Sequence, residues 1–373
     1  MTAVPITASS RAFITNVMSS TLADGAPINR AVECVNPVGQ PDWDAVLARH
    51  PRGSFFQSAA WAAVLADSYG YTPHYFAIRE ADALRALLPV MEVNSWLTGR
   101  RGVALPFTDE CEPLQTEGAT LQSLIPSVLA LGRARRWKHV EFRGGRKLLG
   151  DVPASLAFYS HILELAGDEA QLFGRVDSSV RRAIRKAEKE GVTVEVTDTL
   201  AAVKVFYGLL CQTRKKHGMP PQPFVFFQNI HRHVISRKLG MVVLARHQGI
   251  PVAGAVYFNL GRQAIYKYGA SDEAWQHLRG NNLVMWEAIK WHAQKGFDTL
   301  HLGRTSQGND GLRRFKLGWG AREERTEYVK YDLAGDRFLT DKDESSGWHN
   351  RIFNAMPIFL SKMVGAALYR HWA

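Results

Sequence analysis

The sequence predicts a mixed α/β protein of two domains. At 373 residues the chain is longer than an average domain. Hydrophobic residues make up 46% of it and charged residues 22%, so both halves have enough apolar side chains to form a core. Segments with the alternation of strands and segments with helical spacing follow one another along both halves. We therefore expect central mixed sheets that are flanked by helices.

Composition along the chain predicts the domain boundaries. Residues 1–30 are rich in Ala, Ser and Thr without a sustained period, and we expect a flexible N-terminal arm there. A first domain is predicted over residues 31–165 and a second over residues 166–340. The stretch from about Trp348 to Ala373 is apolar and basic, so we expect a basic amphipathic C-terminal tail over residues 341–373.

In the first domain, turn residues separate segments of clear periodicity. Helices are predicted at Asp42–His50 and Ser58–Ser68, and Ser58 is expected to be an N-cap. The remaining elements are a helix at about Leu121–Arg136 and strands at Tyr75–Ile78, Leu84–Val93, Val103–Phe107 and His139–Phe142.

The second domain repeats this mixture after a strand predicted at Ala157–Leu165. Helices are predicted at Ser178–Glu190, Ala201–Lys216, Phe224–Lys238 and Asn281–Lys295. Strands are predicted at Val192–Val196, Met241–Arg246, Pro251–Phe258, Gln263–Tyr268 and Thr299–Leu302. A helix between the last two strands indicates an α/β crossover.

The net charge of +11 attracts anionic partners, among them nucleic acid, a phosphorylated cofactor and a lipid surface. Cys34, Cys111 and Cys211 lie far apart, which predicts neither a disulfide framework nor a thiolate metal site and favours a cytoplasmic location. His231 and His233 lack further ligands at metal-binding spacing, so no metal is expected. Zinc-finger, basic-zipper and RNP-type patterns are missing from the sequence, and duplex DNA is not an expected partner.

A basic helix is the first segment with a chemical signal. In the segment from Asp177 to Gly191, five cations fall within an arc of about 140°, and the opposite face is apolar. These cations are Arg181, Arg182, Arg185, Lys186 and Lys189, opposite Val180, Ile184 and Ala187. Such a stripe can hold several phosphates. The alternative is a solvated amphipathic face.

The second segment joins a strand to a helix. Tyr266 and Tyr268 are predicted on one face of the strand and Lys267 on the other, an alternation that also suits a strand between core and solvent. Gly280, Asn281 and Asn282 are predicted to supply a turn and a capping side chain at the helix start. Free backbone N–H groups at such a start favour an anion.

The third segment, from His301 to Ala321, combines glycines and cations. Five glycines surround a short helix, which Asp310 is expected to cap and Gly318 to end. Arg313, Arg314, Phe315 and Lys316 lie on this helix. The glycines favour a close approach of the backbone to a ligand. The pattern is neither a P-loop nor a GxGxxG turn.

These segments together resemble a known family. The run LRRFKLGWGA is similar to the RFKxGFG-type signature of FemAB-like proteins, and SSVRRAIRKAEKEGV resembles their basic helix. FFQSAAWAAVL and GVALPFTD resemble the N-terminal half of the same family, so the resemblance covers about residues 31–335. It implies two tandem GNAT-fold domains. Characterised relatives in this family transfer amino acids from aminoacyl-tRNA to the peptide stem of peptidoglycan precursors, and the resemblance implies a related activity.

The resemblance also implies site residues. It places Lys316 and Phe315 at the donor end and Asp109 near the acceptor amine. Tyr268 is expected as a third catalytic residue. Because an attacking amine loses a proton while negative charge builds on oxygen, Asp109 would take or orient the proton and Lys316 would stabilise the oxyanion. The expected donor-binding residues are Arg181, Arg182, Arg185, Tyr266, Gly280, Asn281, Asn282, Arg304, Arg314 and Phe315.

The expected function is therefore transfer of an acyl or aminoacyl group to an amine of a cell-envelope or exopolysaccharide intermediate. Two departures from the family stand out: Leu65 takes a position where peptidoglycan-building members often carry Lys, and the coiled-coil arm of some members is missing. No tightly bound cofactor is expected, and acyl-CoA or aminoacyl-tRNA would be a co-substrate.

Two alternatives remain open. The run from His277 to Asn282 keeps the central glycine of the [QR]xxGx[GA] loop of acyl-CoA-dependent GNAT enzymes, so the chain could acylate a small amine or amino sugar. A non-catalytic protein could use the basic helix to bind RNA or anionic lipid. The tail has Phe353, Met356, Phe359 and Leu360 at helical spacing, with Arg351, Lys362 and Arg370. It would either touch the inner face of the membrane or pack on the protein.

Overall fold

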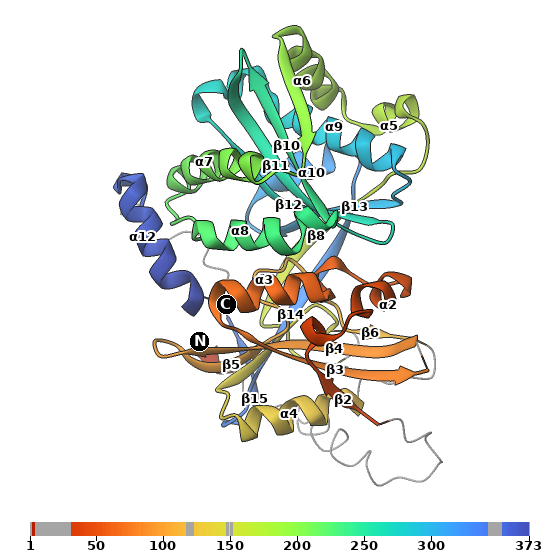
Figure 1. The fold of residues 1–373 in the computed structure, drawn as a ribbon, viewed down its shortest axis with the longest axis vertical. Helices are drawn as coiled ribbons and strands as arrows, with labels where there is room; N and C mark the ends of the chain where they lie inside the picture. The colour runs from red at the N-terminus through yellow and green to blue at the C-terminus, as the bar shows by residue number, and fades with distance from the viewer. Residues whose placement is uncertain are drawn as a thin grey trace. The chain divides into compact units, whose positions relative to one another are not determined.

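The computed structural model describes residues 2–3, 31–81, 83–116, 123–146, 149, 152–341 and 353–372. The chain forms two compact units (Figure 1). The first consists of Met1–Phe158, Arg325–Asp343 and Arg370–Ala373, and the second of Tyr159–Glu324 and Glu344–Tyr369. The predicted arm lies, except for residues 2–3, outside the described residues.

A mixed sheet forms the centre of the first unit. Its strands are β2 (Glu33–Val35), β3 (Thr72–Glu80), β4 (Ala83–Ser95), β5 (Gly99–Val103), β7 (His139–Arg143) and β14 (Arg322–Asp332), in that order. Neighbours pair antiparallel except β5 and β7, which are parallel. The short strands β1 (Thr2–Ala3), β6 (Leu114–Gln115) and β15 (Arg337–Thr340) pair with β15, β4 and β14 respectively.

Helices cover both faces of this sheet. α2 (Trp43–Arg49) and α3 (Ala59–Tyr69) lie on one side and α4 (Leu124–Ala134) on the other (Figure 1). The predicted N-cap of α3 is confirmed, because the Ser58 hydroxyl accepts a hydrogen bond from the Trp61 N–H at 3.0 Å. The core under α4 includes Val329, Tyr331, Leu333 and Phe338 from β14, β15 and their connection.

The second unit has a sheet of predominantly antiparallel strands. β9 (Val192–Thr197), β10 (Gly240–His247), β11 (Ile250–Leu260) and β12 (Gln263–Ser271) pair antiparallel, and β12 pairs parallel with β13 (Thr299–Ser306). β8 (Leu156–Glu164) follows β13 in the sheet order. Along the chain, β8 and β14 each run from one unit into the other.

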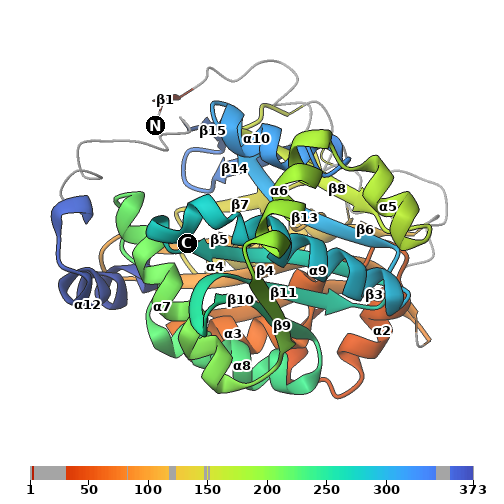
Figure 2. The same ribbon diagram turned by 90° about the horizontal axis from the view of Figure 1, so that it is seen from above.

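The helices of the second unit pack on this sheet. They are α5 (Glu169–Arg175), α6 (Ser178–Lys189), α7 (Leu200–Lys216), α8 (Phe224–His233), α9 (Gly280–Gln294), α10 (Asp310–Leu317) and α12 (Ile358–Leu368). α9 runs along β10 and β11 with α6 beside it (Figure 2). Val180, Ile184 and Ala187 of α6 are buried in the core beneath, which confirms the predicted apolar stripe.

Two predicted elements differ from the structure, and several observed elements were not predicted. The predicted strand Val103–Phe107 is wrong beyond Val103, because Leu105 and Phe107 have left-handed φ angles of 60° and 59°; this apolar run is a buried loop. The predicted helix Phe224–Lys238 ends at His233 and is followed by a 3₁₀ turn at Ile235–Arg237. α5, β2, β6, β14 and β15 were not predicted.

The tail contains α12, which begins after Pro357. Arg351, one of its predicted cations, lies outside the described residues. Within the part of the chain that the structure describes, no helix is both long and apolar enough to cross a membrane.

Candidate functional site

β12 and β13 separate soon after they meet. They pair only through Gln263 with Thr299, Ala264 with Leu300, and Ile265 with His301. Both strands continue beyond this point, to Ser271 and Ser306. Over those halves the two backbones do not form a ladder with each other, although both are fully described. Backbone N–H and C=O groups seek partners, so this separation is a place where a ligand can pair with a strand.

A β-bulge lies at the beginning of the separated part of β12. Val256 of β11 pairs with Tyr268, but the next residue, Tyr257, pairs with Tyr266, so Lys267 is an extra residue. An inserted residue bends a strand and reverses the faces of the side chains beyond it. The bulge therefore redirects β12 where it leaves β13.

The prediction that Tyr266 and Tyr268 share a face is wrong because of this bulge. The centres of the Tyr266 and Tyr257 rings lie 5.5 Å apart, on the side of the core under α9. Burial there raises the pKa of Tyr266 to about 12. The Tyr268 ring instead contacts Phe226 and Phe227 of α8 at 6.4 and 5.5 Å.

The start of α9 has backbone donors and no side-chain cap. Its N-cap is Arg279, with a left-handed φ of 62° and no capping hydrogen bond from its side chain. The prediction of an asparagine cap is therefore wrong: Asn281 and Asn282 belong to the first turn of the helix, and Asn281 is exposed. Gly280 is buried against Val252 and Ala253. The first N–H groups of a helix favour an anion when no side chain caps them.

Lys316 of α10 is a buried cation. Its side chain belongs to a residue that is only 3% exposed, and its Nζ donates to the carbonyl oxygens of Gly303 and Arg304 at 2.8 and 2.9 Å. Gly303 has a left-handed φ of 73°. The ammonium thus holds two consecutive carbonyls of β13 in the half that has left β12.

The ends of α10 explain why Lys316 is placed there. The helix is capped by Asn309, whose side chain accepts from the Leu312 N–H at 3.0 Å, so the predicted cap at Asp310 is wrong by one residue. Gly318 follows the helix as predicted. The Phe315 ring meets Trp319 edge to face at 6.2 Å and packs on the core of the second unit.

A second polar cluster in the same unit involves β8 and β14. His161 is fully buried, and its Nε2 lies 3.1 Å from an oxygen of Glu323. Arg313 of α10 donates two hydrogen bonds to the same carboxylate, both at 2.7 Å. Burial and the nearby positive charge of Lys316 lower the pKa of His161, although Glu323 opposes them. The His161 imidazole is therefore neutral and lies within the electrostatic field of the Lys316 ammonium.

The other predicted donor residues differ in their surroundings. Arg182 and Arg185 of α6 are exposed, whereas Arg181 donates to the carbonyl of Gly174 at 3.1 Å and is half-buried. Arg304 lies on β13, and its backbone carbonyl oxygen accepts a hydrogen bond from the Lys316 ammonium. Arg314 is exposed, and its Nε donates to the Asp310 carbonyl at 3.4 Å.

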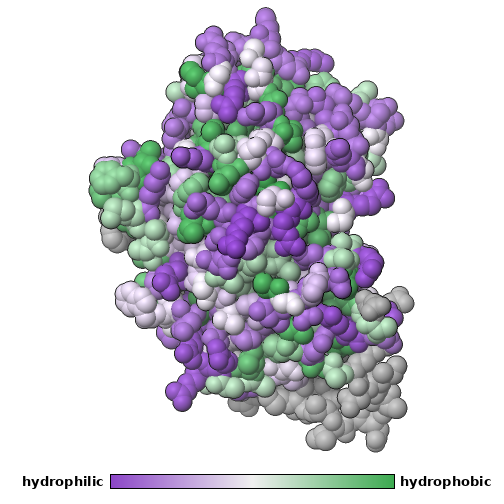
Figure 3. Space-filling model, viewed as in Figure 1, coloured by the Kyte–Doolittle hydropathy of each residue, from purple (hydrophilic) through white to green (hydrophobic). Residues whose placement is uncertain are grey.

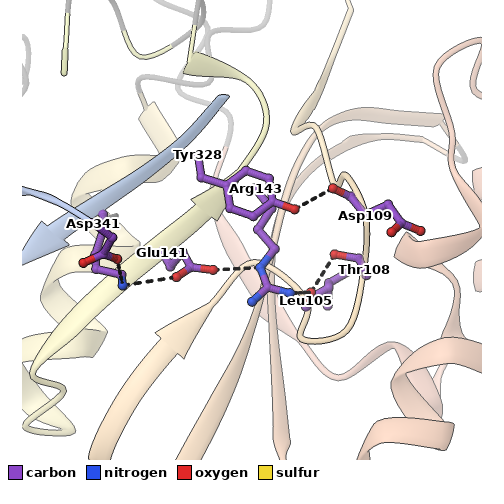
Figure 4. Close-up of polar contacts among 8 residues, drawn as sticks. Leu105, Thr108, Asp109, Glu141, Arg143, Tyr328 and Asp341 are labelled. Atoms are coloured by element: carbon purple, nitrogen blue, oxygen red, sulfur yellow. Dashed lines mark hydrogen bonds and ion pairs between the residues drawn. The ribbon is translucent and has the colours of Figure 1, made fainter. Parts of the chain in front are cut away.

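Asp109 belongs to the first unit, in the loop that follows β5 (Figure 4). The Tyr328 hydroxyl donates to the backbone carbonyl of Asp109 at 2.5 Å. The carbonyl of Leu105 accepts from Arg143 at 3.3 Å and from the Thr108 hydroxyl at 2.7 Å. In Figure 4 the Asp109 carboxylate points away from the Arg143 side chain. The loop is thus held through its backbone carbonyl groups.

A buried ionic network supports this loop. Arg143 donates to Glu141 at 2.7 Å, and Lys330 lies 3.6 Å from the other oxygen of that carboxylate and bonds to Asp341 (Figure 4). Burial raises the pKa of Glu141, but the positive charges of Arg143 and Lys330 outweigh it, so the pKa is lowered. Glu141 is therefore ionised, and it keeps the Arg143 guanidinium in place.

The residues that position the others were not predicted from the sequence. Glu141 lies on the predicted strand His139–Phe142, and Arg143 directly follows it. Residues two apart on a strand share a face, so this charged pair was a usable signal. Tyr328, His161 and Glu323 gave no such signal, because their partners are far away in sequence.

Comparisons with known proteins agree with this geometry. Residues 174–323 match a family model described as acetyltransferase (GNAT) domain. The crystal structure of FemX has a TM-score of 0.61 at 15% identity, and the match covers 77% of this chain and 94% of that chain. The structure of L-PGS from Bacillus licheniformis has a TM-score of 0.51 at 14% identity, and the match covers 90% of this chain and 98% of that chain. A conserved protein of unknown function from Bacteroides thetaiotaomicron VPI-5482 has a TM-score of 0.53 at 11% identity, and the match covers 80% of this chain and 99% of that chain. No curated protein matches the chain in sequence.

The fold around the separated strands is that of a GNAT protein. Residues 174–323 are a GNAT acetyltransferase domain. The structure has the fold of FemX, which confirms the predicted α/β fold class and the predicted resemblance to the FemAB-like branch. At these identities the structural likeness establishes the fold alone.

Proposed function

We propose that this chain is a FemAB-like N-acyltransferase that joins an acyl or aminoacyl group to an amine of a cell-envelope or exopolysaccharide intermediate. The observation that carries the proposal is the separation of β12 and β13 after three paired residues, with the buried cation Lys316 bonded to β13. A thioester or ester carbonyl that pairs with a strand edge in this region lies in the field of that ammonium.

The proposed chemistry is direct transfer without a covalent enzyme intermediate. The acceptor amine attacks the activated carbonyl, the bond to the thiol or ribose oxygen of the donor breaks, and the amine loses a proton. Lys316 stabilises the developing oxyanion by its charge, because a fixed cation in a poorly solvated place acts strongly on new charge. Asp109 takes or orients the proton of the amine, and Tyr268 lies at the bulge as a further positioning residue.

The start of α9 favours acyl-CoA as the donor, because uncapped N–H groups suit a pyrophosphate. The exposed cations of α6 favour aminoacyl-tRNA, because they suit a run of phosphates. Both donors fit the same transfer step. They differ in which element recognises them, and single charge changes can therefore separate them.

The donor is tested by incubating the protein with acetyl-CoA, longer acyl-CoA or charged tRNA and measuring the midpoint of thermal unfolding. Asn281→Asp should weaken acyl-CoA protection about tenfold, since it adds a negative charge at the anion site. Gln294→Glu places the same charge at the other end of α9 and should leave protection unchanged. Protection by charged tRNA alone, lost in Arg182→Gln/Arg185→Gln and kept in Arg237→Gln/Lys295→Gln, assigns the donor to tRNA. Protection by neither class contradicts the proposed function.

The catalytic roles are tested by a double-mutant cycle. Asp109→Asn and Lys316→Met should each lower kcat by about 10²- to 10³-fold. If both residues act on one transfer step, the double variant should lose much less than the product of the two effects. Fully multiplicative losses would contradict a shared step.

A further inference from the structure

The last helix of the second unit turns its large apolar side chains outward. In α12 the buried residues are small, Ser361 and Gly365, whereas Phe359 is 64% exposed and Met363 is 65% exposed. A terminal helix that serves only to cover a core does the opposite. Apolar residues gather on the surface over this helix (Figure 3).

Close contacts fix α12 in this orientation. A Cβ atom on Gly365 would lie 2.0 Å from the Pro221 carbonyl oxygen, so only glycine permits this approach. The Tyr369 hydroxyl donates to the carbonyl of Pro220 at 3.1 Å. The Lys362 ammonium lies 5.3 Å from the centre of the Tyr207 ring on α7. Rotating the helix to bury Phe359 and Met363 would break all three contacts.

The surroundings of the exposed side chains are basic. α12 lines a groove with α7 and α8, in which Tyr207, Phe224 and Met363 provide apolar surface and Lys204 and Lys362 provide charge. The sequence from Gly347 to Ala373 contains no Asp or Glu. Apolar side chains with lysines beside them and no acidic residue in the segment match the interface of an anionic bilayer.

The first unit carries a second patch of the same composition. Trp96 is 86% exposed and Leu97 is 51% exposed in the turn between β4 and β5, and Trp372 is 44% exposed near the C-terminus. The patch is built rather than loose: His371 packs edge to face on Trp96 at 5.4 Å, and its carbonyl accepts from the buried Arg101 at 2.8 Å. Tryptophan is favoured at the level of lipid headgroups.

We propose that α12, through Phe359 and Met363, binds the surface of an anionic lipid bilayer. The apolar side chains enter the boundary between headgroups and acyl chains, and Lys204 and Lys362 neutralise lipid phosphates. This inference goes beyond the proposed transfer reaction, and it holds for either donor.

The test is flotation of the whole protein with vesicles of phosphatidylcholine, with and without one third phosphatidylglycerol. The expected result is binding to the anionic vesicles, which decreases with added salt, and little binding to phosphatidylcholine alone. Phe359→Ser/Met363→Ser should reduce partitioning at least about tenfold. The matched control is Leu200→Ser/Ile250→Ser, which removes two other exposed apolar residues of the same unit and should bind as the unchanged protein does.

Two outcomes would overturn the proposal. One is equal binding of the unchanged protein and the Phe359→Ser/Met363→Ser variant, both having unchanged thermal midpoints. The other is concentration-dependent dimerisation in gel filtration that the same variant abolishes without any vesicle binding, because the helix would then contact a second copy. Donor protection is measured in the absence of vesicles, so failure of the proposed function gives a separate result.

Discussion

Lys316 shows how a residue can be both structural and chemical. The fold places its ammonium under two consecutive carbonyls of β13, where the strand has left its neighbour. Burying a cation is costly unless hydrogen bonds compensate, and here the backbone supplies them. The same bonds keep a positive charge beside the strand that the proposed donor would pair with.

Replacing Lys316 should therefore affect stability as well as transfer. Lys316→Met keeps most of the side-chain volume but leaves the carbonyls of Gly303 and Arg304 without this donor, and the free energy of unfolding should fall by about 1–3 kcal/mol. Urea denaturation followed by tryptophan fluorescence measures it. Arg314→Met makes the same change on the exposed side of α10 and should stay within about 0.5 kcal/mol. Equal losses in both variants would contradict the structural part of this role.

Buried histidines should make the folded protein less stable in acid. Burial lowers the pKa of His292 from 6.5 to about 4, and the ring lies 2.8 Å from the Ala288 carbonyl oxygen and 3.0 Å from the Asn259 side-chain oxygen. Between these values the unfolded chain binds a proton and the folded chain does not. Stability is therefore complete above pH 6.5 and decreases as the pH falls towards 4, by up to about 1.4 kcal/mol per pH unit for one such group.

His292→Gln removes the group that binds a proton only in the unfolded chain. The slope of the free energy of unfolding against pH should therefore decrease between pH 6.5 and 4.5, by the amount that about one bound proton contributes. The measurement is urea unfolding at a series of pH values. The remaining slope should include His139 of the first unit, whose pKa burial likewise lowers to about 4. Parallel pH profiles of the variant and the unchanged protein would show that His292 does not titrate in this way.

Tyr266 and Tyr268 mark the limit of what single residues reveal from sequence. The alternation rule assigns them to one face, but the extra residue Lys267 separates them. A bulge depends on the register with the neighbouring strand, and that register is not written in the strand itself. The basic stripe of α6 was predicted correctly because a helix is set by contacts within its own sequence.

The bounds of most helices were predictable, although the N-caps predicted for α9 and α10 were wrong. α3, α6, α7 and α9 begin and end within one or two residues of their predicted bounds. Local signals determine such ends, as Ser58 does at the start of α3 and Gly318 does at the end of α10. The loop after Val103 was not predictable in this way, because its side chains are as buried as those of a strand and only its left-handed φ angles distinguish it.

Ser58→Ala should lower the free energy of unfolding by about 1 kcal/mol, because the Trp61 N–H would lose its acceptor in a buried place. The measurement is the midpoint of urea denaturation. Ser178→Ala is a suitable control, since Ser178 is exposed at the start of α6 and is not its N-cap. A comparable loss in the control would mean that the cap is not the cause.

At the scale of the whole molecule, the two units are not consecutive stretches of sequence. Sequence patterns located most strands of both sheets, but they missed β2, β6 and the return of residues 325–343 to the first unit. Nothing local distinguishes a strand that joins the nearest sheet from one that joins an earlier sheet, because both alternate in the same way. Val329 and Tyr331 could have been placed only through their partners in β7.

A chain that ends after Glu324 should therefore fail to fold its first unit. It would lack Val329, Tyr331, Leu333 and Phe338, each of which contributes about 1.5–3 kcal/mol by burial. Their sum is comparable to the whole stability of a domain. Limited proteolysis should show rapid cleavage within residues 31–146, whereas a chain that ends after Asp341 should resist it. Equal resistance of the two chains would contradict this assignment of the core.

The hydrogen bond between Tyr328 and the carbonyl of Asp109 has a consequence for biogenesis. During synthesis the loop of Asp109 leaves the ribosome long before its anchor Tyr328 is translated, because residues 159–324 of the second unit are made in between. Contacts at such separation in sequence form slowly and leave apolar strand surface open in the meantime. The nascent first unit should therefore depend on chaperones until almost the entire polypeptide has emerged, and the loop that carries Asp109 would be among the last parts of the protein to mature.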